Sequence, residues 1–252
     1  MSKREGDPAK RNLIITLLGR KGMGKTYTAW QVIEGEPRVI ALDTMGEYAG
    51  RGATVTWGKE GAIRAMLEAS KKRRYRLSLR GLDEDEMLDA LEMAWELPDS
   101  LVVVEEASMI CRASYLPREL ARLVRYGRHR NISQLYIARR PSELPRDLTA
   151  QSDLIVTLQQ TEPVDVKYLR AAGFKERELL ALAAMPEDQA RGYLLVKGDR
   201  SLLPLAIAER LDAQKPLPGV TLEMPLTDDP DPDSDSAEGE DADREAAESP
   251  EQ

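Results

Sequence analysis

The strongest constraint on this chain is a glycine-rich pattern between an apolar run at residues 12–18 and a helix-like segment at residues 27–30. It reads Gly19-Arg20-Lys21-Gly22-Met23-Gly24-Lys25-Thr26 and matches the P-loop, or Walker A, pattern G-x-x-x-x-G-K-[ST]. The glycines allow a tight turn in which successive backbone N–H groups point inward, and the start of the following helix adds its positive dipole end. The pattern therefore predicts that residues 19–26 bind the phosphates of ATP.

Two side chains of this P-loop have specific predicted roles. Lys25 reaches the β- and γ-phosphates, and Thr26 places its hydroxyl on Mg²⁺, so ATP and Mg²⁺ are the predicted cofactors. A glycine-rich loop that binds nothing is disfavoured by the strand before the pattern and by the absence of proline at residues 27–36. The pattern does not specify what ATP hydrolysis drives.

Further apolar runs predict a central sheet. Residues 37–42 are apolar almost throughout, as expected for a strand buried on both faces of a parallel sheet, and Asp43 follows them. An acid at such a strand end either faces the nucleotide or a neighbouring subunit, or is a solvated loop acid. Other strands are predicted at residues 54–57, 75–80, 101–104, 132–138 and 152–158, with a hairpin at 191–200 leading to 203–208. Helices are predicted at residues 60–73, 84–96, 116–130, 164–172 and 175–185. The fold class is therefore α/β, with a mainly parallel central sheet flanked by helices.

The second chemical landmark is the short apolar strand at residues 101–104, which delivers two carboxylates at its end. In P-loop NTPases one acid at this Walker B position serves the Mg²⁺ shell, and in many hydrolysing members the next acid polarises the attacking water. We therefore assign Glu105 to Mg²⁺, through water, and Glu106 to the general base. The usual residue at the first position is Asp, so Glu105 extends the reach by one methylene. Two exposed loop acids are the alternative, which the upstream P-loop disfavours.

Cations gather in two further segments. The segment at residues 116–130 contains Arg118, Arg122, Arg125, Arg128 and Arg130. The first three are three or four residues apart and share one helix face. An arginine here reaches the γ-phosphate held by an adjacent subunit, or the arginines form a solvated face or a patch for DNA phosphates. His129 is interpreted as a loop or interface residue. The four cations at residues 71–74 either contact nucleic-acid phosphates or form a solubilising helix end.

Charge separates the body of the chain from its tail. The formal net charge is -8, and residues 226–252 carry twelve Asp or Glu against the single Arg244, which leaves +3 for residues 1–225. From about residue 214 the sequence is rich in proline and then acidic, which predicts disorder. Such a tail solvates the protein, competes with DNA for a basic channel or docks to a partner. We therefore expect a flexible N-terminus at 1–11, one ATPase domain at 12–213 and a disordered tail at 214–252.

The single cysteine, Cys111, excludes an intrachain disulfide and fits a reducing cytoplasm. The N-terminal residues are polar and charged, and the apolar run after them is too short for a signal sequence or a membrane span. We therefore expect no membrane-spanning segment.

Four landmarks in order resemble the HerA/FtsK superfamily of ring-forming, DNA-pumping ATPases. They lie at residues 19–26, 39–48, 102–106 and 127–145. The resemblance extends over about residues 12 to 207. Only the P-loop is specific by itself, and the ordered set carries the resemblance.

The resemblance implies a RecA-like core and a homo-oligomeric ring, hexameric or pentameric, with double-stranded DNA bound without sequence specificity in a basic pore. It places an arginine finger before the fourth core strand, at Arg128 or the nearby Arg130. It also places a γ-phosphate-sensing Gln at the end of that strand, where this chain has Arg139. Lys25, Glu106, Arg128 and Arg139 are thus the expected catalytic residues.

Within this superfamily, a nearly bare motor core is similar to the genome-packaging ATPases of membrane-containing icosahedral viruses. Only eleven residues precede the first predicted strand, so no N-terminal barrel domain is expected. The expected function is ATP hydrolysis coupled to translocation of double-stranded DNA for viral packaging. The expected location is the host cytoplasm or a virion vertex, with virion or procapsid vertex proteins as partners.

Three alternatives remain open. A cellular or plasmid-borne motor of the same superfamily serves DNA repair or transfer. A small-molecule kinase needs a lid and an acceptor pocket, and the sequence has no separate segment for either. A nucleotide-binding regulator without turnover is the stronger non-motor alternative, because Glu105 and Arg139 replace the usual Asp and Gln.

Overall fold

The chain divides into two units, Met1–Lys215 and Pro216–Gln252, and a computed structural model describes residues of the first. The described residues are 12–50, 52–185, 191–197 and 201–206. The expectations for residues 1–11 and for the acidic tail at 214–252 lie outside them, as does the turn of the predicted hairpin at residues 198–200.

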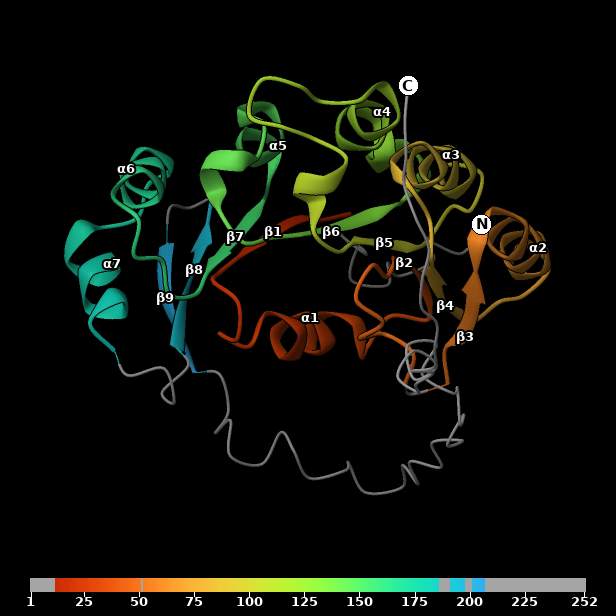
Figure 1. Cartoon of the computed structure of the whole chain (residues 1–252), viewed down its shortest axis with the longest axis horizontal. Helices are drawn as coiled ribbons and strands as arrows, with labels where there is room; N and C mark the ends of the chain where they lie inside the picture. Colours follow the sequence, from red (N-terminus) through yellow and green to blue (C-terminus); the bar gives the residue numbers. More distant parts are fainter. Residues whose placement is uncertain (1–11, 51, 186–190, 198–200, 207–252) are drawn as a thin grey trace, which may run out of the picture. The chain divides into compact units, whose positions relative to one another are not determined.

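The described strands form one nine-stranded sheet in the order β3-β4-β2-β5-β6-β1-β7-β8-β9 (Figure 1). The strands are β1 (Ile14–Leu18), β2 (Arg38–Leu42), β3 (Thr54–Trp57), β4 (Tyr75–Arg80), β5 (Leu101–Val104), β6 (Ser133–Ala138), β7 (Leu154–Thr157), β8 (Arg191–Val196) and β9 (Ser201–Ala206). The first seven pair in parallel, and β8 and β9 add an antiparallel edge. The predicted mainly parallel sheet is therefore confirmed.

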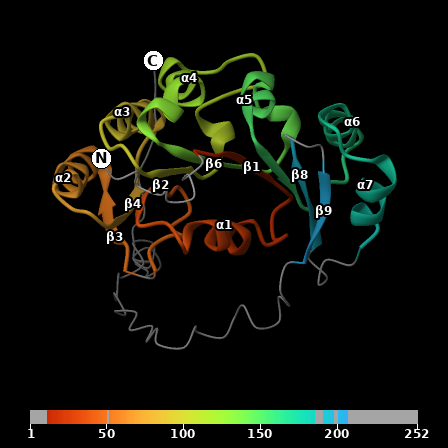
Figure 2. The ribbon, with the colours of Figure 1, turned by 180° about the vertical axis from the view of Figure 1, so that it is seen from behind.

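Helices cover both faces of the sheet. Helix α1 (Lys25–Ile33) lies on one face, and α2 (Gly58–Ser70), α3 (Glu84–Ala94), α4 (Arg118–Tyr126) and α5 (Arg146–Gln151) lie on the other (Figures 1 and 2). Helices α6 (Pro163–Ala172) and α7 (Glu176–Ala183) lie beside the antiparallel edge. No helix of the described residues combines the length and the apolar character that a membrane crossing needs.

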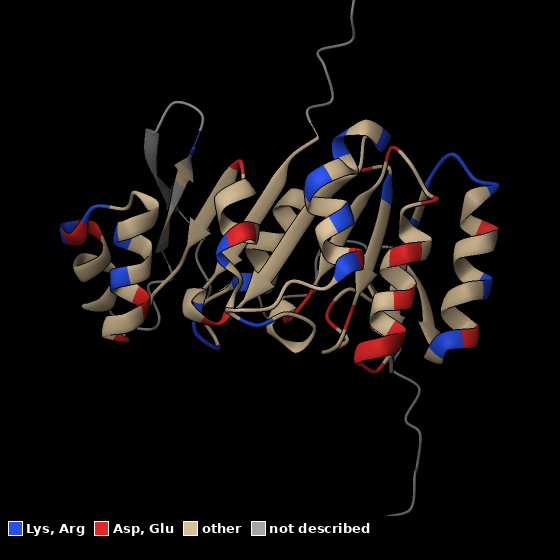
Figure 3. Ribbon diagram, turned by 90° about the horizontal axis from the view of Figure 1, so that it is seen from above, with Lys and Arg blue, Asp and Glu red and all other residues tan. Residues whose placement is uncertain are grey.

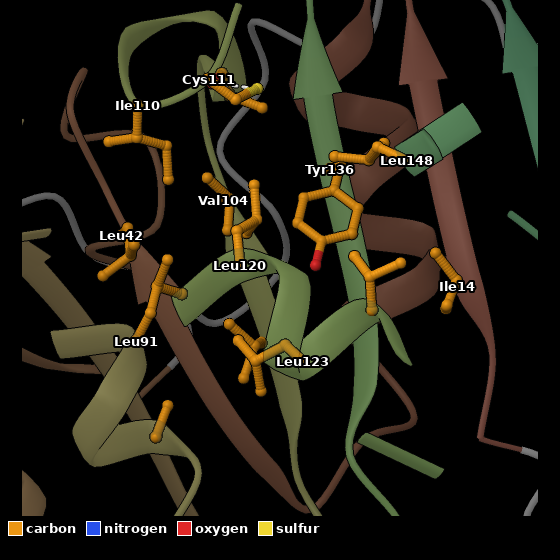
Figure 4. Packing of buried hydrophobic residues seen from close by; sticks show 14 of the residues in the cluster. Ile14, Leu42, Leu91, Val104, Ile110, Cys111, Leu120, Leu123, Tyr136 and Leu148 are labelled. Atoms are coloured by element: carbon orange, nitrogen blue, oxygen red, sulfur yellow. Dashed lines mark hydrogen bonds between the residues drawn. The ribbon is translucent and has the colours of Figure 1, made fainter. Parts of the chain in front are cut away.

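Alternate side chains of each central strand pack on opposite faces, because successive residues of a strand point to opposite sides. Leu17 and Val103 contribute to the core under α1, together with Ile33 of that helix. Val104 and Tyr136 contribute to the other core, where Figure 4 shows them beside leucines of α4. Both faces of the central strands are buried, which explains why the sequence shows continuous apolar runs instead of alternation.

The loop after β5 also belongs to this second core. Cys111 is fully buried there, and its thiol donates a hydrogen bond to the Ala107 carbonyl at 3.0 Å. Burial raises the pKa of the Cys111 thiol to about 12. The thiol of this chain is therefore packed as a small apolar side chain.

The helix predicted at residues 116–130 is shorter than expected. Helix α4 ends at Tyr126, and a 3-10 turn, Gly127–Arg130, follows. The Gln134 side chain donates to the Leu123 carbonyl at 2.8 Å, and a Cβ at Gly127 would lie only 2.6 Å from Gln134 Nε2. This close approach of β6 ends the regular helix. Helix α5 is an element that the sequence analysis did not predict.

Candidate nucleotide site

The carboxyl ends of β1, β2, β5 and β6 meet at one edge of the sheet, because these strands are parallel. The residues that follow them are Gly19, Asp43, Glu105 and Arg139. In open α/β sheets, ligands bind outside the carboxyl ends of the strands. The topology thus brings the P-loop, both predicted carboxylates and Arg139 to the same edge.

The P-loop adopts a conformation that depends on its glycines. Gly22 and Gly24 have φ values of 82° and 86°, in the left-handed region that other residues rarely adopt. Gly24 is also the N-cap of α1, and no side chain caps this helix. The first N–H groups of α1 therefore point into the loop without a side-chain acceptor, which is the arrangement of an anion site.

Lys25 closes the loop on itself. Its ammonium donates to the carbonyl oxygens of Gly19 at 2.8 Å and Arg20 at 3.1 Å. Burial lowers the pKa of Lys25 below its usual value, while the carboxylates of Glu106, Glu47 and Glu105 oppose that shift. The lysine is thus held within the electrostatic reach of three acids at the same edge.

Glu105 is buried between carboxylates. Only 6 % of the residue is exposed, and its Oε2 atom has no hydrogen-bond partner. Burial, together with the nearby Glu47 and Asp43 carboxylates, raises the pKa of Glu105 to about 8. A buried, unpartnered carboxylate oxygen is costly by itself, and a nearby cation would compensate that cost.

Glu106 has a different environment from its neighbour. It lies in the left-handed region, with φ 51° and ψ 56°, immediately after β5. Its Oε2 accepts a hydrogen bond from Arg139 Nε at 3.1 Å, and its Oε1 accepts one from the Ser108 hydroxyl at 3.3 Å. The predicted base and the predicted γ-phosphate sensor therefore form an ion pair, in which Arg139 is half exposed.

The loop after β2 contributes Glu47, which the sequence analysis did not assign to the site. Asp43 is buried and accepts hydrogen bonds from the backbone N–H groups of Glu47 and Tyr48, at 2.8 and 3.0 Å. Ser78 and Arg80 of β4 donate to the same carboxylate. Burial and Asp43 raise the pKa of Glu47, and Lys25 opposes that shift. Asp43 thus shapes the loop instead of facing solvent.

Two glutamines after β7 were also missed. Gln159 accepts from the Arg20 backbone N–H through its carbonyl at 3.3 Å and from the Arg20 guanidinium through Oε1 at 3.4 Å. Its Nε2 donates to the carbonyls of Leu182, Ala183 and Met185 at the end of α7. Gln160 donates to the Arg139 carbonyl at 2.9 Å. The sequence signal that could have identified these glutamines is a pair of polar residues shortly after a buried strand.

Arg128 and Arg130 lie elsewhere. They precede β6, whose six residues span about 20 Å, so they lie at the sheet edge opposite the P-loop. Arg130 donates to Glu96 at 3.1 Å and to the Trp95 carbonyl at 3.2 Å, whereas no ion pair of Arg128 is seen among the described residues. Neither arginine reaches the P-loop of its own chain.

The residues present fit Mg²⁺ bound with a nucleotide. Within the described part of the chain, no group of three or more His, Cys, Asp or Glu is arranged to hold a metal ion alone. Mg²⁺ in nucleotide sites typically keeps several waters and uses one or two protein ligands plus phosphates. Thr26 in the first turn of α1 and the unpartnered Glu105 oxygen supply such a set.

Comparison with solved structures places the fold. The chain is similar to the genome-packaging NTPase B204 of Sulfolobus turreted icosahedral virus 2, solved with ATP-gammaS, with a TM-score of 0.59 and 12 % identity over 77 % of this chain and 96 % of B204. It is also similar to VirB4 of Thermoanaerobacter pseudethanolicus, with a TM-score of 0.54 and 12 % identity over 76 % of this chain and 88 % of VirB4. No protein-family model and no curated protein matches the sequence. The described residues therefore share the fold of these two proteins, which agrees with the α/β P-loop fold that the sequence implied.

Proposed function

We propose that this protein is an ATPase that couples hydrolysis to the translocation of double-stranded DNA. The observation that carries the proposal is the convergence of the P-loop, Glu105, Glu106 and Arg139 at one sheet edge, with Lys25 inside their electrostatic field. The similarity to a genome-packaging NTPase over nearly all of that protein supports viral packaging as the specific role.

The residues have distinct roles in this proposal. The N–H groups of the P-loop and Lys25 hold the phosphates. Thr26, and Glu105 through water, would hold Mg²⁺, which would supply positive charge next to the transferred phosphoryl group. Glu106 takes the proton of the attacking water after the Arg139 guanidinium has left the Glu106 carboxylate. Arg139 moves to the γ-phosphate, a shift that its half-exposed position allows.

We propose a homo-oligomeric ring, hexameric or pentameric, with the nucleotide between subunits. Arg128 is the proposed arginine finger, because Arg130 is held by Glu96 and Trp95 while Arg128 is exposed without an ion pair among the described residues. Its position at the edge opposite its own P-loop requires that it act on the site of an adjacent subunit. We place the ring in the host cytoplasm or at a virion vertex, with vertex proteins as partners.

The test is steady-state ATP hydrolysis with and without long double-stranded DNA. Lys25→Ala removes the phosphate-binding cation, and Lys59→Ala is the matched control, since Lys59 is an exposed lysine paired with Asp89. We expect DNA to stimulate the wild type and the control, and Lys25→Ala to lose turnover. Mass photometry on the same samples tests the ring. Hydrolysis that DNA does not change contradicts the translocase.

The Glu106–Arg139 ion pair also supports a second function, a nucleotide-binding regulator without turnover. In that case Arg139 stays paired with the Glu106 carboxylate when ATP is bound, so Glu106 cannot act as a base. A single-turnover measurement separates the two functions, because the regulator retains its bound ATP in the presence of DNA.

A further inference from the structure

The two basic regions of the sequence have different partners in the structure. In Figure 3 the acidic helix α3 lies between α4 and α2. Arg122 of α4 lies 3.8 Å from Glu92 and Arg130 lies 3.1 Å from Glu96, while Arg125 lies 3.7 Å from Asp147 of α5. Acids of the same chain therefore partly neutralise the basic face of α4.

The segment between α2 and β4 lacks this compensation. Lys71 pairs with Glu68 at 2.8 Å, but Lys72, Arg73 and Arg74 have no anionic side chain within 4.0 Å among the described residues, and all are exposed. The same holds for Arg64 on α2. These four cations are therefore not paired with an acid among the described residues, and Figure 3 shows the loop between α2 and β4 in blue.

Three of these cations line a groove that also contains an exposed aromatic ring. The groove has a volume of about 580 Å³ and runs beside the edge strand β3, with Arg64, Lys72, Arg74 and Trp57 among its lining residues. Trp57 is 68 % exposed. The Arg80 guanidinium lies 5.7 Å from its ring centroid, and a Cβ at Gly81 would lie 3.0 Å from its Cε3 atom. Arg80 and Gly81 therefore hold the ring from one side while most of it stays accessible.

We propose that this groove binds one strand of nucleic acid, with the cations on its phosphates and the Trp57 ring stacked on an unpaired base. Cations that track a backbone beside an aromatic platform are the combination that single-stranded nucleic acid recognises, without sequence preference. Among the described residues, Glu68 is the only acid that lines the groove, and Lys71 pairs with it. The proposal goes beyond the proposed function, which concerns double-stranded DNA, because it adds a site for an unpaired strand.

The binding experiment uses the full chain without nucleotide, a labelled oligothymidine and a labelled duplex, followed by fluorescence anisotropy across a salt series. The test variant is Lys72→Ala with Arg74→Ala. The control is Arg122→Ala with Arg125→Ala, which removes the same charge from α4. We expect the test variant to bind oligothymidine about tenfold more weakly, and its slope of log affinity against log salt to flatten by about 1.4. The control changes little.

The Trp57 ring is tested separately. Trp57→Ala weakens oligothymidine binding by about tenfold and duplex binding much less, while Trp57→Phe retains most of the affinity, because stacking needs a ring and not the indole itself. Mass photometry accompanies these variants. A changed oligomeric state of Trp57→Ala with unchanged DNA affinity identifies the ring as a subunit contact and overturns the proposal.

Another result also overturns it: equal losses of affinity in the test and control pairs. The proposed function fails separately. If the groove variants lose DNA affinity but DNA does not stimulate wild-type hydrolysis, the groove is a nucleic-acid site and the translocase is wrong. If hydrolysis is stimulated and the groove variants bind normally, the translocase stands and the groove is excluded.

Discussion

Glu105 and Glu106 are consecutive in the sequence but have opposite environments. Glu105 is buried, with one unpartnered oxygen and a pKa raised by burial to about 8. Glu106 turns away in the left-handed region and pairs with Arg139. The difference shows that position along the strand does not decide the role. A carboxylate buried beside other acids is suited to a cation, whereas one held by a half-exposed arginine is suited to release and proton transfer.

The sharpest test of this difference is the loss of the base. We expect Glu106→Gln to lower kcat by about 10² to 10⁴, because the amide cannot take a proton from water. ATP affinity is retained, since the P-loop is untouched. Measurement of kcat and of nucleotide affinity checks both, with Glu84→Gln on the exposed start of α3 as the control. A similar kcat in Glu106→Gln and in the control means that Glu106 is not the base.

Glu105→Gln should affect the metal more than the base step. We expect the Mg²⁺ concentration for half-maximal hydrolysis to rise by about 10- to 100-fold, as for other groups that orient a bound metal. Saturating Mg²⁺ should then restore much of the rate, whereas it should not rescue Glu106→Gln. If Mg²⁺ rescues the Glu106 variant instead, the two roles are reversed.

The Arg139→Ala variant tests whether Arg139 leaves Glu106 and binds the γ-phosphate. We expect Arg139→Ala to weaken binding of a non-hydrolysable ATP analogue by about tenfold, the loss of one charge-assisted hydrogen bond, while ADP binding is unchanged. Arg170→Ala, which removes an exposed arginine paired with Glu176, is the control. Equal weakening for ADP would show that Arg139 does not read the γ-phosphate.

The smallest effect concerns the backbone at Glu106. Its φ of 51° favours glycine. The free energy of unfolding of Glu106→Gly should therefore be about 1 kcal/mol higher than that of Glu106→Ala. At Glu92, in a regular helix, the order should reverse, with the Gly variant less stable by about 1 kcal/mol. Urea unfolding of the four variants measures both differences. The same order at both positions would show that the turn is not strained.

The fold and the P-loop were predictable because their signals are local. The pattern of the eight residues from Gly19 to Thr26 is enough to predict the conformation of the loop. Continuous apolar runs are enough to predict strands that are buried on both faces. The roles of Glu105 and Glu106 were assigned from the order of two motifs, the P-loop and the Walker B strand. The topology brings both residues to the edge that holds the P-loop, while their roles stay predictions.

Other parts of the site depend on contacts between distant segments. Glu47 reaches the field of Lys25 because Asp43 organises its loop, and that acid is itself held by Ser78 and Arg80 of another strand. The partners of the α4 arginines belong to α3 and α5. Neither arrangement leaves a pattern in a single stretch of sequence.

Gln159 has a mechanical consequence. One side chain joins Arg20 of the P-loop to three carbonyls at the end of α7. A displacement of Arg20 must therefore either break these bonds or carry the last turn of α7 with it. Gln159 thus couples the position of the P-loop to the position of α7, a helix that lies outside the P-loop.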